Sequence, residues 1–111
     1  MNKLTIEKLQ EVSTKRNPEV MENCIVPKEH WDLFFSNALA GEVGEFCNLI
    51  KKVKRGSRKL DAKTRKEIRH ELADCQTYLV QCAESLGINL ADATVEKFNL
   101  VSKKWRSKIV L

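Results

Sequence analysis

The sequence predicts an all-α protein, an antiparallel bundle of about four helices. Apolar residues recur at spacings of three and four along most of the chain, which is the helical period. The 111 residues include only four Gly and two Pro, whereas a β-sandwich or barrel needs turn residues about every 8–12 positions. A chain of this length buries one core, so we expect residues 1–111 to form a single domain.

Capping residues mark the ends of the first two predicted helices. Thr5 suits the N-cap of a first helix that runs toward Arg16, and Asn17-Pro18 is expected to stop it. Pro27 suits the first turn of a long second helix, which reaches about Lys54.

The second half of the chain carries the same signals. Arg55-Gly56-Ser57 breaks the second helix, and Asp61 caps a third helix that ends at Gly87. Asn89 caps the fourth helix. Short connections between helices of this length favour antiparallel neighbours in a helical bundle.

Each long helix has an apolar seam that we expect to face the core. The second helix offers Phe35, Leu39, Glu42, Phe46, Leu49 and Val53. The third offers Ile68, Leu72, Cys75, Leu79, Cys82 and Leu86. The fourth offers Ala91, Val95, Phe98, Ser102 and Trp105. One short and three long helices leave apolar surface uncovered, so we expect oligomerisation to a homodimer or homotetramer to complete the bundle.

Positive charge is concentrated in one window. The chain has a net charge of +5, and residues 51–70 hold 10 of its 20 Lys and Arg against two acidic residues. That window therefore carries +8 and the rest of the chain −3. A local positive field of this kind attracts phosphates, on a nucleotide or on a nucleic acid.

The remaining composition indicates a cytoplasmic protein. No apolar run approaches the roughly 20 residues of a membrane span, and residues 1–10 lack the apolar stretch of a secretion signal. The four Cys, at positions 24, 47, 75 and 82, lack the spacing of a zinc site. We expect free thiols, as in a reducing compartment, and no membrane partner.

Two pairs of carboxylates stand at helical spacing. Glu42 interrupts the seam of the second predicted helix, and Glu45 follows three residues later on the same side. Glu71 and Asp74 repeat this spacing beside the seam of the third helix. If the two seams face each other, the four carboxylates converge and repel one another unless a cation lies among them. The pattern predicts a site for Mg²⁺, with Mn²⁺ as an alternative.

Glu42-Val-Gly-Glu45 followed by Glu71-Leu-Ala-Asp74 resembles the ExxE…ExxD signature of the MazG-like all-α nucleotide pyrophosphohydrolases. The resemblance covers about residues 28–111. It continues through the stretches Asn37-Ala-Leu-Ala-Gly, Cys47-Asn48, Lys51-Lys52, Tyr78-Leu79, Leu86-Gly-Ile-Asn-Leu90 and Glu96-Lys97-Phe98-Asn99.

The resemblance implies a helical dimer or tetramer that hydrolyses a nucleoside triphosphate, often a deoxy form, to the monophosphate and pyrophosphate with Mg²⁺. Such enzymes serve in housecleaning or in control of the dNTP pool. The metal ligands that it implies are Glu42, Glu45, Glu71 and Asp74. It also implies Lys97 and Asn99 as phosphate or sugar contacts.

Other residues near the motifs are candidates for catalysis or substrate binding. We expect Glu45 to act as general base and Lys51, Lys52 and Lys97 to hold the phosphates. Candidate contacts to base, sugar or phosphate are Trp31, Asn37, Asn48 and Tyr78. Trp31 also has a structural interpretation as a core or dimer contact, and the two Asn side chains as exposed polar groups.

Three other functions remain open at this stage, and one of them is structural, a helical dimer whose inherited motif no longer turns over. A basic nucleic-acid-binding module accounts for the charge, but residues 51–70 contain no aromatic residue and the carboxylates repel a phosphate backbone. A phosphoribosyl-ATP pyrophosphohydrolase shares the helical metal site, although the GEVGE and KFN sequences here are more similar to MazG-like proteins.

Overall fold

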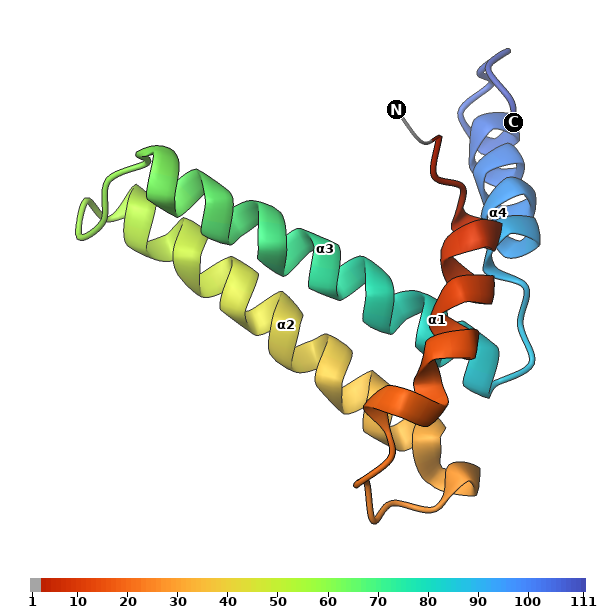
Figure 1. The fold of residues 1–111 in the computed structure, drawn as a ribbon. Helices are drawn as coiled ribbons and strands as arrows, with labels where there is room; N and C mark the ends of the chain where they lie inside the picture. Colours follow the sequence, from red (N-terminus) through yellow and green to blue (C-terminus); the bar gives the residue numbers. More distant parts are fainter. Residues whose placement is uncertain (1–2) are drawn as a thin grey trace.

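The computed structural model describes residues 3–111, and the described chain is all-α, as predicted (Figure 1). It contains four α-helices and one short 3₁₀ turn, and no strand is present in residues 3–111. The elements are α1 (Ile6–Val20), η1 (Lys28–His30), α2 (Trp31–Lys54), α3 (Ala62–Ser85) and α4 (Leu90–Lys104).

The predicted N-caps are confirmed. The side chains of Thr5, Asp61 and Asn89 accept hydrogen bonds from backbone N–H groups three residues on, at 3.0, 2.9 and 3.1 Å. Each bond satisfies a donor that has no partner inside its helix. Gly56 and Gly87, in the connections after α2 and α3, have φ of 81° and 68°, a backbone region that favours glycine.

The predicted stop of the first helix at Asn17-Pro18 is wrong. α1 continues through Pro18 to Val20. A proline this close to the end removes one hydrogen bond from the last turns. Burial of the flanking residues offsets that loss, because Asn17 and Met21 are only 6% and 9% exposed. The Met21 N–H also still donates to the Asn17 carbonyl at 2.8 Å.

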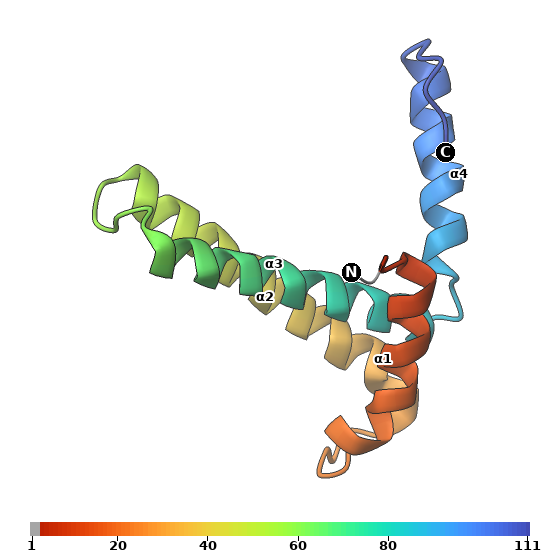
Figure 2. The same cartoon turned by 45° about the horizontal axis from the view of Figure 1, so that its top comes forward.

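Two long antiparallel helices organise the molecule. α2 and α3 lie side by side along their length, α1 crosses the end where α2 begins, and α4 leads away from the end of α3 (Figures 1 and 2). Among the described elements α4 touches α1 and α3 but not α2. The Cα radius of gyration is 16.8 Å, against about 13 Å for a compact domain of this length. A single chain is thus an open arrangement of helices.

The seam of α2 faces inward as predicted, since every one of its six residues is buried or half-buried. The predicted seam of α3 is partly wrong. Leu72, Leu79 and Leu86 are 49%, 43% and 59% exposed, whereas Glu71 and Tyr78 are half-buried. Neighbouring residues on a helix point about 100° apart, so burial of Glu71 and Tyr78 turns the three leucines outward.

The outer surface of α4 differs from its prediction in the same way. Ala91 is half-buried and Ser102 is buried, but Val95, Phe98 and Trp105 are 43%, 42% and 74% exposed. Trp105 was expected to pack within the fold, and in a single chain it does not. α4 packs only against α1 and the end of α3, so only one face of α4 is covered.

The basic window lies at the tip of the α2–α3 hairpin, far from α1 and α4 (Figure 1). Arg58 donates to Thr64 at 3.0 Å and pairs with Glu67 at 2.6 Å, which ties the loop to the start of α3. None of the described helices is long and apolar enough to span a bilayer. All four Cys are free thiols, as expected.

The Asp61 cap should carry a measurable part of the stability of α3. We expect Asp61→Ala to lower the free energy of unfolding by about 1 kcal/mol, measured by urea denaturation followed by circular dichroism. Asp61→Asn is the matched control, because an Asn side chain also caps well. An Asp61→Ala protein as stable as the wild type would contradict the role of the cap.

Candidate metal centre

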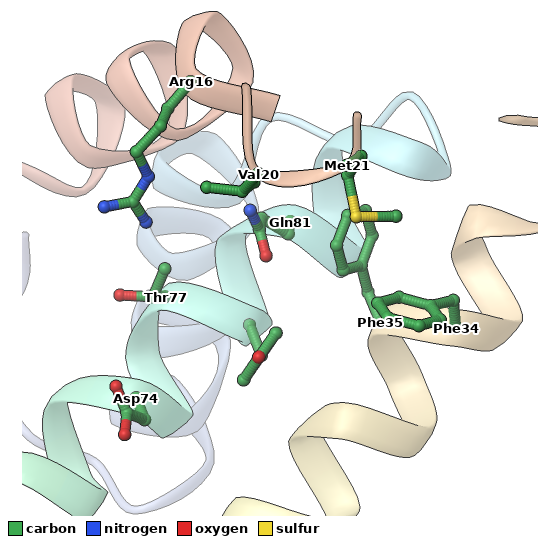
Figure 3. Close-up of a pocket in the computed structure, with 9 residues that line it drawn as sticks. Arg16, Val20, Met21, Phe34, Phe35, Asp74, Thr77 and Gln81 are labelled. Carbon is green, nitrogen blue, oxygen red and sulfur yellow. The ribbon is translucent and has the colours of Figure 1, made fainter. Parts of the chain in front are cut away.

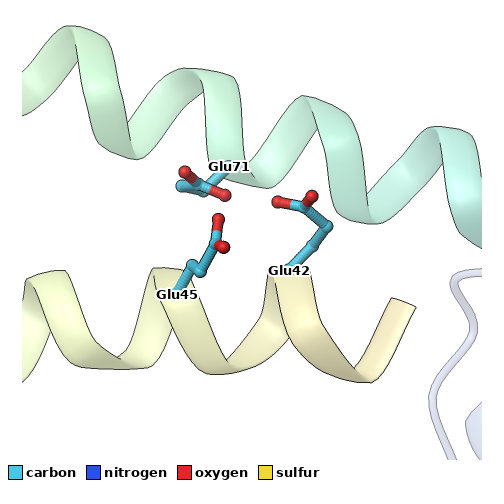
Figure 4. Close-up of side chains that lie close together, drawn as sticks. All are labelled: Glu42, Glu45 and Glu71. Atoms are coloured by element: carbon cyan, nitrogen blue, oxygen red, sulfur yellow. The ribbon is translucent and has the colours of Figure 1, made fainter. Parts of the chain in front are cut away.

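Three glutamates converge between the two long helices (Figure 4). Glu42 and Glu45 project from α2 on one side because they are three residues apart. Glu71 projects toward them from α3. One carboxylate oxygen from each residue lies within 4.8 Å of the others. Carboxylates at this separation surround a space that suits a cation with oxygen ligands.

The cluster contains oxygens that the protein leaves without partners. Glu42 and Glu71 are half-buried, and the Oε2 atom of each is buried without a hydrogen-bond partner among the described residues. A buried carboxylate oxygen without a partner costs free energy. A divalent cation would satisfy both oxygens at once, so the residues fit the metal that the sequence predicts. Their hard oxygen donors match Mg²⁺ or Mn²⁺.

Close approach of the carboxylates makes Glu45 and Glu71 harder to ionise. The adjacent carboxylate of Glu71, through its contact and its negative charge, raises the pKa of Glu45 above its ordinary value. The pKa of Glu71 is raised mainly by the adjacent carboxylate of Glu42 and by burial. Asp74 adds negative charge to both. The cluster therefore holds more negative charge than the bare protein stabilises.

Asp74, the fourth predicted ligand, lies outside the group of three. It is exposed, stands one turn after Glu71, and lines a neighbouring cavity of about 320 Å³ (Figure 3). The cavity lies between α1, the start of α2 and the second half of α3. We name it the α1 pocket. It is lined by Arg16, Val20, Met21, Phe34, Phe35, Asp74, Thr77, Tyr78 and Gln81.

Aromatic residues form one wall of the α1 pocket. Phe35 is 2% exposed and lies with its ring 5.6 Å from that of Phe34 and 6.5 Å from that of Tyr78. The structure therefore brings the predicted contact Tyr78 to a cavity beside the carboxylates. Asp74 connects that cavity to the cluster, since it lines the one and adds charge to the other.

Trp31 and Asn37 lie elsewhere. Trp31 lines a second cavity, of about 300 Å³, on the other side of Phe35, and its Nε1–H donates to the Val26 carbonyl at 3.1 Å. The Nδ2 atom of Asn37 donates to the Leu33 carbonyl one turn earlier, at 2.8 Å. Neither residue lines the α1 pocket. Within one chain both side chains hold the start of α2 together.

The other α2 candidates follow the cluster along the helix. Asn48 is exposed one turn beyond Glu45. On the next turn Lys51 is exposed and Lys52 is half-buried. Lys52 stands two turns from Glu45, about 10 Å along the axis. All three lie beyond the carboxylates in the C-terminal part of α2.

The α4 candidates are not brought to the carboxylates within one chain. Lys97 lines an open apolar groove on α4, and α4 does not touch α2. Asn99 donates to the Leu111 carbonyl at 3.2 Å and accepts from the Leu111 N–H at 2.9 Å. Its amide thus fastens the C-terminal segment of the chain.

Three residues of the site region were not anticipated. Arg16, Asn17 and Gln81 lie where α1 meets α3, and the Gln81 amide donates to the Asn17 side-chain oxygen at 2.7 Å. Gln81 had a signal in the sequence, because it follows Asp74 by seven residues, two turns along the same face. Arg16 and Asn17 had none, since nothing local to α1 indicates which helix it crosses.

The carboxylates of the site lie in a region that matches a known protein family. The model of the MazG nucleotide pyrophosphohydrolase domain matches residues 34–106. The chain belongs to that family. The matched region contains the whole carboxylate cluster and the helices that carry it, and it leaves out α1. Neither the curated proteins nor the solved structures give a match.

Neutralising one member of the cluster should stabilise the metal-free protein. Ionised carboxylates with raised pKa values oppose folding, so Glu71→Gln should raise the melting temperature at neutral pH. The advantage should shrink as the pH falls through the raised pKa, because wild-type Glu71 then takes up a proton. Mg²⁺ at a hundred times its Kd should stabilise the wild type by about 2.7 kcal/mol and Glu71→Gln far less.

Differential scanning fluorimetry from pH 5 to 8, with EDTA or Mg²⁺, measures both effects. Glu29→Gln is the matched control, because Glu29 is exposed and lies outside the cluster. A Glu71→Gln protein that is less stable than wild type without metal at neutral pH would contradict the repulsion.

Proposed function

We propose that the protein hydrolyses a nucleoside triphosphate, deoxy forms included, to the monophosphate and pyrophosphate in an Mg²⁺-dependent reaction. The observation that carries the proposal is the group of three glutamate oxygens within 4.8 Å of one another, inside a MazG domain. The Oε2 atoms of Glu42 and Glu71 are buried without partners among the described residues, which supports a bound cation as part of the working site.

Glu42, Glu45 and Glu71 would hold the metal, and Asp74 stands at the open side toward the substrate. When bound, Mg²⁺ supplies neutralisation of the polyphosphate charge and lowers the pKa of a bound water. Mn²⁺ offers the same ligand preferences.

Glu45 is our general base. It is the exposed member of the cluster, so an attacking water can reach its carboxylate and pass a proton to it. A carboxylate oxygen of Glu45 takes a proton from the attacking water as the water oxygen bonds to the α-phosphorus. The bond between the α-phosphorus and the α–β bridging oxygen breaks, and its electron pair leaves with the pyrophosphate.

Lys51 and Lys52 bind the departing phosphates in this proposal. They lie on the last turns of α2 at the edge of the basic window, where negative charge is attracted. The same positive field raises the local concentration of a triphosphate before it reaches the glutamates. In cells, such an activity serves dNTP-pool control or housecleaning in the cytoplasm.

A second copy of the chain completes the site in our proposal. The outward leucines of α3 (Leu72, Leu79 and Leu86) and the apolar groove of α4 are apolar surfaces that a single chain leaves exposed. Pairing through these faces would bury them, and would give Lys97 a route to the carboxylates of the partner subunit. Asn99 stays with the C-terminal segment that it fastens.

The alternatives are weaker on specific grounds. Nucleic-acid binding rests on the basic hairpin tip, which offers no aromatic side chain for stacking and leaves the glutamates without a role. A phosphoribosyl-ATP substrate would use similar chemistry, but the family match is to the MazG domain.

The activity is tested by incubating the protein with each of the eight standard NTPs and dNTPs, with Mg²⁺ or EDTA, and separating the products by ion-exchange chromatography. We expect monophosphate and pyrophosphate only with metal. Glu45→Gln should lower kcat by about 10²–10⁴-fold, and Glu42→Gln and Asp74→Asn should abolish turnover with helicity intact. Glu29→Gln should match the wild type.

Three results would contradict this proposal. Formation of diphosphate and orthophosphate would show that the protein cleaves the β–γ bond and not the proposed α–β bond. Full turnover in EDTA would show that the reaction needs no metal. No turnover of any of the eight nucleotides would exclude the proposed activity.

Oligomerisation is tested by light scattering coupled to size-exclusion chromatography. We expect a mass at least twice the 12.8 kDa of one chain. Leu79→Glu should shift the mass toward the monomer, because it places a charge in the outward apolar face. Ile25→Glu is the control, since Ile25 is 96% exposed in the connection after α1. A wild-type monomer would contradict the proposed pairing.

A further inference from the structure

Gln81 presents an unpaired acceptor to the α1 pocket. The residue is 4% exposed and lines the pocket, and its side-chain oxygen points away from Val20 (Figure 3). That oxygen accepts no hydrogen bond from any of residues 3–111. An amide oxygen that lines a cavity and has no donor from the protein is free to accept a hydrogen bond from a ligand.

Asn17 determines which end of Gln81 faces the pocket. The Gln81 Nε2 atom donates to the Asn17 side-chain oxygen at 2.7 Å, and Asn17 is itself 6% exposed. With its amine end engaged by α1, Gln81 turns its oxygen to the cavity. At this point on its wall the pocket therefore offers a ligand a hydrogen-bond acceptor.

The surroundings of that oxygen suit a flat aromatic ring. Tyr78, which is half-buried, and Phe34, which is 37% exposed, line the same cavity, and aromatic faces stack on nucleobases with little regard to their identity. The volume of about 320 Å³ lies at the lower end of small-molecule sites. Stacking supplies affinity here, and the single acceptor of Gln81 supplies selection.

The position matches the length of a nucleotide. Gln81 follows Asp74 by seven residues, about 10 Å along α3. A base and sugar span such a distance, so a base beside Gln81 places its phosphates beside Asp74 and the glutamates. Arg16, which forms no ion pair among the described residues, adds a guanidinium on the Thr77 side of the pocket (Figure 3).

We propose that the Asn17–Gln81 pair selects cytosine over uracil and adenine over hypoxanthine, by accepting a hydrogen bond from the exocyclic amine of the selected base at the Gln81 oxygen. This inference rests on the proposed function, since it concerns the substrate of the same site. Uracil and hypoxanthine carry an oxygen in place of the amine. That oxygen would face the Gln81 oxygen, so two acceptors would meet without a proton between them.

Binding of non-hydrolysable analogues tests the selection without turnover. Isothermal titration calorimetry with Mg²⁺ would compare the α,β-imido analogues of dCTP and dUTP, which differ in hydrogen bonding but hardly in shape. We expect the wild type to bind the cytosine analogue about tenfold more tightly, the effect of one hydrogen bond gained against one clash of acceptors. The adenine and hypoxanthine analogues should show the same order.

Variants separate selection from folding. Gln81→Met keeps the length of the side chain without the acceptor, so its ratio of affinities should fall to within about twofold of unity. Gln81→Glu keeps an acceptor and should retain the preference. Asn17→Asp still accepts from the Gln81 amine and should match the wild type, whereas Asn17→Leu frees Gln81 and should lose selection.

The ratio of wild-type affinities for the cytosine and uracil analogues tests the inference even if a variant fails to fold. Equal affinity of the wild type for the two analogues, or a preference for uracil, would overturn the inference. An unchanged ratio in a folded Gln81→Met protein would overturn it as well. A protein that hydrolyses no triphosphate but still prefers the cytosine analogue would contradict the proposed activity and leave the selection intact.

Discussion

The repulsion among Glu42, Glu45 and Glu71 is the constraint on which this molecule depends. Their helices are pressed together by apolar residues on both sides of the cluster, Phe35 at one end of α2 and Leu49 toward the other. The backbone therefore cannot open to relieve the crowding, and two carboxylate oxygens remain buried without partners. Packing energy from the seam maintains a site that would be unfavourable alone, and a cation converts that repulsion into attraction.

The first helix extends this site beyond the family domain. α1 lies outside the matched residues 34–106, yet it closes one side of the pocket next to Asp74. Its hold on α3 is polar as well as apolar, because the buried Asn17 and Gln81 amides bond to each other. A buried polar pair of this kind specifies one orientation of the packed helices, since any other leaves both amides unsatisfied. Packing and recognition thus use the same side chains.

The exposed apolar surface of the chain also follows from the polar cluster between α2 and α3. Only five hydrophobic side chains are buried among the described residues, and α4 rests on α1 and the end of α3 alone. Helices that hold a polar cluster between them have less apolar area left to bury against each other. The outward leucines of α3 and the exposed face of α4 are the consequence, and they are the surfaces that we propose a second copy of the chain covers.

Local chemistry in the sequence determined the helices, their N-caps and the set of carboxylates, because caps and i, i+3 spacing act within one or two turns. Tertiary structure decided what each helix faces. The period of three and four left α3 with two candidate inner faces, and contact with α1 and α2 chose the one with Glu71 over the one with Leu72. Burial of Asn17 and Met21 likewise kept α1 helical past Pro18. Hydrogen bonds with the Leu111 backbone engaged the Asn99 side chain. The pairing of Asn17 with Gln81 joins residues 64 positions apart, a separation across which no local pattern carries information.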